Sequence, residues 1–235
     1  MSSESRCALR SSILRKQIVA VTGLILTGFL AGHLAGNFLI FLGPEAFNGY
    51  SEKLHAIPEL LWLVRLGLIA AFLIHVITTI LLTLENRQAR GERYAVNGSK
   101  SEESLKFAKK TMIYTGLLVL FFLVLHLSDF TLSDKEGPAS MIAAGEGNPP
   151  RNLGLYGLVW NSFLEPWRAG VYIAVMLVLG LHLSHGIQSL CQTLGFYRND
   201  LVPRIRKLSL VLGLLAAIGF SSVPLFINIV RTPPL

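Results

Sequence analysis

Five long apolar stretches constrain this chain of 235 residues more than any other feature. Each reaches the ~20 residues that an α-helix needs to cross the hydrocarbon core of a bilayer. Only helices and closed barrels satisfy all their backbone hydrogen bonds in lipid. We therefore predict an all-α integral membrane protein in which residues 1–235 form one domain. Its five transmembrane helices are predicted at about residues 17–43, 60–84, 111–130, 168–193 and 208–230.

The charged residues support this class, because they lie almost entirely outside the apolar stretches. Only 15% of the residues are charged, whereas a soluble domain carries about 25%. Inside the stretches the only Lys, Arg, Asp or Glu are Arg65, Asp129 and Arg168. All three lie near helix ends, where we expect their side chains to reach towards the interface. The net charge of +7 is spread over loops, so no nucleic-acid partner is predicted.

Lysine and arginine are concentrated in every second segment between the apolar stretches. The segment before the first stretch, the second loop and the fourth loop together carry fifteen of the 21 Lys and Arg residues. The positive-inside rule therefore predicts a cytoplasmic N-terminus and a C-terminus on the outside. We therefore expect a multi-pass protein of the cell inner membrane.

Each of the first three predicted spans contains one histidine, and the fourth contains two, His182 and His185. An imidazole in hydrocarbon is costly and usually has a function. At about 1.5 Å of rise per residue, His33 and His126 lie about 24 Å from the cytoplasmic ends of their helices, and His75 and His182 about 15–16 Å from theirs. The four residues thus form an outer pair, His33 and His126, and an inner pair, His75 and His182.

Two histidines from different helices are what an iron with two axial imidazoles requires. We therefore predict two b haems, one for each pair. Zinc is a weaker alternative, because it would need about four ligands at one site. A histidine proton relay in a haem-free transporter is the alternative from another class. His185, one turn from His182, is a competing ligand. Neither Cys7 nor Cys191 belongs to a C-x-x-C-H sequence, so covalent haem attachment is not predicted.

Two short motifs resemble a known family. The run His33-Leu34-Ala35-Gly36-Asn37 resembles the first-helix H-L-x-x-N of the di-haem cytochrome b subunit of succinate:quinone oxidoreductases and fumarate reductases. The run from His182 to Ile187, HLSHGI, resembles the H-x-x-N-G-I/L of that superfamily, in which the first histidine is the haem ligand. The resemblance implies His182 as the ligand and supporting roles beside the ligands for His185 and Asn37.

The same resemblance implies a function. The chain would be the membrane anchor of a succinate dehydrogenase (complex II), passing electrons through two haems to menaquinone or ubiquinone. Its partners would be a flavoprotein with FAD and an iron–sulfur subunit on the cytoplasmic face. A fumarate reductase running in the reverse direction is the alternative, and the cytochrome b of a formate dehydrogenase or hydrogenase is a further rival. Some menaquinol-oxidising relatives have a proton-conducting Glu two residues before the fourth-helix ligand. Here that position is Gly180, so the same proton route is not expected.

Quinone reduction consumes protons, so a titratable group should stand beside the quinone. In the first outer loop the candidates are Glu52, His55 and Glu59. A second candidate site is the run Ser12-Ile13-Leu14-Arg15-Lys16, similar to the S-I-L-x-R that borders the quinone in single-haem relatives, with Ser12 and Lys16 as quinone contacts. Lys16, Arg65 and Arg168 are candidate partners for haem propionates.

The long third loop, about residues 131–167, is rich in Gly and Pro. Its residues Trp160, Phe163 and Trp167 predict an amphipathic segment that lies in the membrane interface. No close sequence repeat is evident in the chain.

Overall fold

The five predicted membrane helices are all present in the computed structural model, which describes residues 12–88, 100–143, 149–196 and 198–233, with backbone alone for residues 100–110. The described chain is almost entirely helical, and five helices are long and apolar enough to cross a membrane. The predicted all-α membrane fold is therefore confirmed. The spans are Ser12–Leu42, Pro58–Gln88, Thr111–Thr131, Pro166–Thr193 and Val202–Val230.

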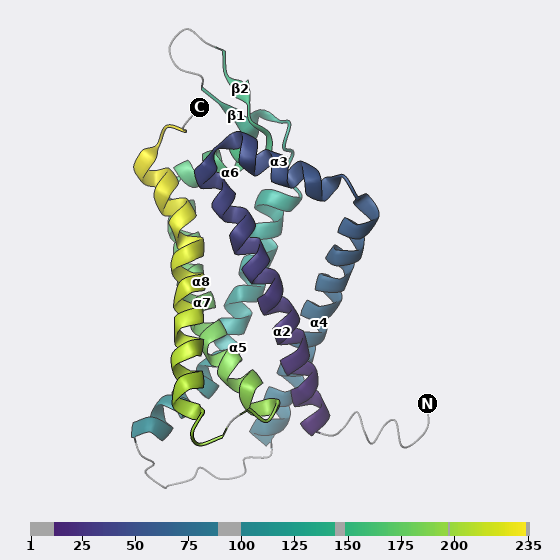
Figure 1. Cartoon of the computed structure of the whole chain (residues 1–235), viewed down its shortest axis with the longest axis vertical. Helices are drawn as coiled ribbons and strands as arrows, with labels where there is room; N and C mark the ends of the chain where they lie inside the picture. The colour runs from purple at the N-terminus through teal and green to yellow at the C-terminus, as the bar shows by residue number, and fades with distance from the viewer. Residues whose placement is uncertain (1–11, 89–99, 144–148, 197, 234–235) are drawn as a thin grey trace. The chain divides into compact units, whose positions relative to one another are not determined.

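The helices extend beyond the apolar stretches that predicted them. They are α2 (Ser12–Phe38), α4 (Pro58–Gln88), α5 (Lys100–His126), α7 (Pro166–Thr193) and α8 (Val202–Val230) (Figure 1). A 3-10 helix, η1 (Leu39–Leu42), continues α2, and a π-helix, η2 (Leu127–Thr131), continues α5. Proline is the first residue of α4 and α7, where its missing N–H leaves no intrahelical bond unmade.

Shorter elements join the spans. They are α3 (Pro44–His55), the 3-10 helix η3 (Pro138–Ser140), the strands β1 (Met141–Ile142) and β2 (Arg151–Asn152), and α6 (Gly154–Leu164). The two strands pair antiparallel, with Met141 opposite Asn152. Helix α6 contacts η3, α3 and β1 (Figure 1).

Part of the third loop, where an interfacial amphipathic segment is predicted, forms the buried helix α6. Tyr156 and Trp160 are completely buried and Phe163 nearly so, whereas Trp167, in α7, is 60% exposed. The polar Asn161 of α6 is partly buried and donates hydrogen bonds to the carbonyls of Ala139 and Met141. The α6 residues Tyr156, Val159, Trp160 and Phe163 belong to the buried hydrophobic cluster of the described residues. Gly157 permits this packing, because a Cβ there would overlap the Ser140 carbonyl.

The chain divides into two compact units. The first comprises Met1–Phe29, Arg65–Leu117 and Leu181–Gly213, and the second comprises Leu30–Val64, Leu118–Gly180 and Leu214–Leu235. His75 and His182 both belong to the first unit, and His33 and His126 both belong to the second. Each predicted histidine pair therefore lies inside one unit.

Candidate functional site

The outer pair is formed by two imidazoles that face each other across two helices. The ring centroids of His33, on α2, and His126, the last residue of α5, are 5.8 Å apart, and their planes are inclined by 83°. Two imidazoles on opposite sides of one metal ion, each with its nitrogen ~2 Å from the metal, place their centroids about 6 Å apart. The spacing of the outer pair therefore suits a shared metal.

Aromatic rings surround the outer pair. The centroid of the His126 ring lies 5.4 Å from that of Phe130, 5.8 Å from that of Phe122 and 6.2 Å from that of Tyr172. Phe220 of α8 lies 5.8 Å from His33. The buried Nδ1 of His126 has no hydrogen-bond partner among the described residues. Buried polar atoms are rarely left unpaired, so this nitrogen marks the position as unusual.

Asn37 contacts its own helix. Its Nδ2 donates a hydrogen bond to the backbone carbonyl of His33 at 2.8 Å. The hydroxyl of Thr79 likewise donates to the carbonyl of His75 at 2.6 Å. Each bond reinforces the helix turn that follows a paired histidine.

The inner pair is positioned by two threonines that the sequence reasoning missed. The Oγ1 of Thr22, on α2, lies 3.1 Å from Nδ1 of His75, on α4. The Oγ1 of Thr115, on α5, lies 3.0 Å from Nδ1 of His182, on α7. His75 and His182 both belong to the first compact unit. The structure thus brings His75 and His182 into one neighbourhood and holds each ring from an adjacent helix.

A glycine follows each of these threonines and gives the imidazole room. A Cβ added to Gly23 would lie 3.3 Å from Cε1 of His75, and one added to Gly116 would lie 3.3 Å from Cε1 of His182. A side chain at either position would therefore press on the ring.

These threonines belong to a short sequence repeat, although no close repeat was expected in the chain. Residues 22–33, TGLILTGFLAGH, and residues 115–126, TGLLVLFFLVLH, are identical at six of twelve positions. Both segments read T-G-x9-H, beginning at a threonine of the inner pair and ending at a histidine of the outer pair. Eleven residues make about three helical turns, so the threonine and the histidine lie on one face of their helix.

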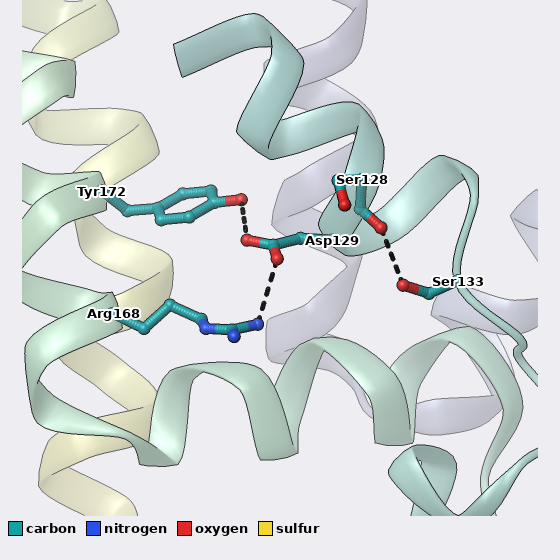
Figure 2. Close-up of polar contacts among 5 residues, drawn as sticks. All are labelled: Ser128, Asp129, Ser133, Arg168 and Tyr172. Atoms are coloured by element: carbon teal, nitrogen blue, oxygen red, sulfur yellow. Dashed lines mark hydrogen bonds and ion pairs between the residues drawn. The ribbon is translucent and has the colours of Figure 1, made fainter. Parts of the chain in front are cut away.

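Asp129, in the π-helix η2 directly after His126, contacts α7 instead of reaching for the interface. Its carboxylate accepts hydrogen bonds from the Arg168 guanidinium at 3.1 Å and from the Tyr172 hydroxyl at 2.8 Å (Figure 2). The Asp129 side chain is only 9% exposed. We expected both charged side chains to extend separately towards the interface, but the structure shows an ion pair. Single π-turns occur frequently at functional sites.

The first-loop candidates for the quinone lie on α3. Glu52 and His55 line a pocket of about 920 Å³, together with polar residues of the third loop that include Lys135, Glu136 and Arg151. Its volume falls within the ~300–1,000 Å³ common for ligand sites. His55 Nδ1 lies 2.8 Å from the Ser51 carbonyl oxygen. Glu59 lies in the first turn of α4 and is not among the lining residues.

The remaining candidates are more scattered. Ser12 and Lys16 are exposed in the first turns of α2. Arg15, between them in sequence, forms an ion pair with Glu85 of α4. His185 is partly exposed on α7, one turn beyond His182. Within the described ranges, no three His, Cys, Asp or Glu side chains gather into a metal-binding group.

The fold and site together define a class, namely a five-helix membrane protein with two histidine pairs, each pair drawn from two helices. Comparisons with known protein families, with characterised proteins and with solved structures find no match to this chain. The functional conclusion therefore depends on the chain's own residues.

Proposed function

We propose that this chain is the membrane-anchor cytochrome b subunit of a succinate dehydrogenase, located in the cell inner membrane. His33 and His126 would hold one b haem, and His75 and His182 the other. The histidine pairing carries the haem part of the proposal, and the resemblance of the runs His33–Asn37 and His182–Ile187 to the family motifs supports the assignment to a succinate dehydrogenase. His33 and His126 lie within one compact unit with ring centroids 5.8 Å apart, and His75 and His182 lie within the other, which supports the pairing.

The protein groups fit a haem with two axial histidines. The porphyrin provides four nitrogens, so the protein needs to supply only two, and each pair has two. The 5.8 Å spacing of the outer rings supports this ligation, and the hydroxyl contacts at Nδ1 of His75 and His182 leave Nε2 as the metal-binding atom. When bound, such a haem supplies one-electron transfer and has no open position for a substrate.

We further propose that the partners are a flavoprotein with FAD and an iron–sulfur subunit on the cytoplasmic face. This chain has no role in dicarboxylate binding in the proposal. If bound at the two histidine pairs, the haems would supply one-electron transfer between the iron–sulfur subunit and the quinone. Fumarate reduction is the same pathway in reverse.

The pocket on α3 is our proposed site for menaquinone or ubiquinone. His55 Nδ1 can donate to the Ser51 carbonyl, which leaves Nε2 as the atom that exchanges a proton with the quinone oxygen. Glu52 lines the same pocket and can pass a proton between His55 and water. The pocket favours Glu52 and His55 over Ser12 and Lys16, which lie exposed on the first turns of α2.

The test is haem quantification with an absorption spectrum of the purified chain. Two b haems per chain are expected in the wild type. His126→Ala and His182→Ala should each retain one haem, because each removes a ligand from a different pair. His185→Ala and His55→Ala are matched controls that should retain two.

A colourless wild-type protein would exclude the proposal and leave the histidine-relay transporter as the better reading. Retention of both haems in His126→Ala would show that the pairing is wrong. Loss of a haem in His185→Ala, with none lost in His182→Ala, would move the ligand role to His185.

A further inference from the structure

Both imidazoles of the inner pair contact a threonine hydroxyl through Nδ1. We propose that Thr22 and Thr115 are positioning residues that fix the Nδ1-protonated form and the orientation of His75 and His182. The functional part of this inference rests on the proposed haem ligation, but the tautomer does not.

The direction of each hydrogen bond follows from the hydroxyl's other contacts. Thr22 Oγ1 lies 2.7 Å from the Ile18 carbonyl, four residues earlier on the same helix. A hydroxyl has one proton to donate and two lone pairs to accept with. Because the proton is directed to the carbonyl, the oxygen accepts from His75, and His75 Nδ1 carries a hydrogen. The Val19 carbonyl lies 3.2 Å from the same hydroxyl oxygen, so both backbone neighbours of Thr22 Oγ1 are acceptors.

Thr115 has the same arrangement. Its Oγ1 lies 3.0 Å from the Met112 carbonyl and 3.2 Å from the Thr111 carbonyl. Its lone pair is therefore available to Nδ1–H of His182. In both residues Nε2 has no proton and keeps its lone pair, which is the form that binds a metal.

The glycine after each threonine complements the hydrogen bond. It allows the imidazole edge to approach the neighbouring helix at Cε1, the carbon next to Nδ1. Threonine supplies the acceptor and glycine supplies the space. Because the T-G step occurs on both α2 and α5, the two inner imidazoles are held by equivalent devices.

The hydrogen bond also has an electronic consequence. An imidazole that donates from its far nitrogen is a more basic metal ligand, and a more basic ligand stabilises ferric over ferrous iron. Loss of the hydroxyl should therefore raise the reduction potential of the haem at the inner pair. Loss of such an outer contact commonly costs ~10–100-fold in metal affinity or activity. A tenfold change in the ferric-to-ferrous ratio corresponds to about 59 mV for one electron.

The first experiment compares Thr22→Val, which keeps the shape and removes the hydroxyl, with Thr22→Ser, which keeps the hydroxyl. Potentiometric titration of the purified holoprotein should show one of two haems shifted upwards by about 59 mV in Thr22→Val and returned towards the wild-type value in Thr22→Ser. Thr83→Val is the matched control. The Thr83 hydroxyl donates to the Thr79 carbonyl of its own helix, so both potentials should stay unchanged.

The second experiment reads the tautomer without haem. Histidine ¹⁵N NMR of haem-depleted protein should assign the proton of His75 and His182 to Nδ1. Thr22→Val should increase the Nε2-protonated fraction of His75 alone, and Thr115→Val that of His182 alone. Should one valine variant fail to fold, the other and the serine variant still test the inference.

The outcomes separate the two ideas. An Nε2-protonated wild-type form, or unchanged tautomers and potentials in both valine variants, would overturn the positioning role even if two haems are bound. Absence of haem from the wild type, with Nδ1-protonated His75 and His182, would overturn the proposed function and leave the tautomer assignment standing.

Discussion

At the scale of single residues, His126 differs from both inner histidines in what its Nδ1 contacts. His75 and His182 each have a threonine hydroxyl at about hydrogen-bonding distance. Nδ1 of His126 is buried without a partner among the described residues and is surrounded by aromatic rings. Polar contacts therefore orient the inner imidazoles, whereas ring packing orients His126.

Asp129 is the residue whose replacement should most affect stability near His126. Asp129→Asn removes the charge that faces Arg168, which is only 29% exposed. An unpaired, partly buried charge is costly, so we expect a loss of about 1–3 kcal/mol of unfolding free energy. Thermal unfolding in detergent measures it. The exposed pair of Arg198 and Asp200 gives the control, since Asp200→Asn should change stability by less than about 0.5 kcal/mol. Equal effects of the two variants would contradict the expected role of burial.

At the scale of elements, the spans could be predicted from the sequence and α6 could not. Apolar length alone identifies a span. Helix α6 has only 11 residues, and its aromatic content suits an interfacial segment as well as a buried one. The buried packing of α6 depends on Gly157, because its backbone lies against the Ser140 carbonyl at the end of η3. The sequence pattern does not specify that η3 packs there. The inner-site threonines were overlooked because Thr in a membrane helix is ordinarily bonded to its own backbone, as Thr83 is.

The buried tyrosine of α6 predicts a pH dependence. Burial raises the pKa of Tyr156 to about 12, whereas the phenol of an unfolded chain titrates near 10. The resulting stabilisation is complete below about pH 10 and is lost as the pH rises from about 10 to 12. Wild-type unfolding free energy should therefore fall more steeply over this interval than that of Tyr156→Phe. Chemical denaturation at several pH values measures the difference, and parallel curves would show that Tyr156 titrates normally.

At the scale of the whole molecule, each compact unit contains one histidine pair. A ligand that binds the folded state stabilises the region that it contacts. In hydrogen-exchange mass spectrometry, His126→Ala should therefore increase exchange in Leu118–Gly180, with little change in Arg65–Leu117. His182→Ala should increase it in Arg65–Leu117 instead. Uniform increases in both variants would show that the two units do not respond separately.

The T-G-x9-H repeat relates two pairs of helices. Helices α2 and α5 each contain a threonine–glycine step followed eleven residues after the threonine by a histidine. The threonine of α2 contacts the histidine of α4, and the threonine of α5 contacts the histidine His182 of α7. The pairs α2 with α4 and α5 with α7 therefore present equivalent contacts to their histidines. In engineering terms the helix pair is a reusable module, and a designed homodimer of one such hairpin would contain every polar contact that orients the inner imidazoles.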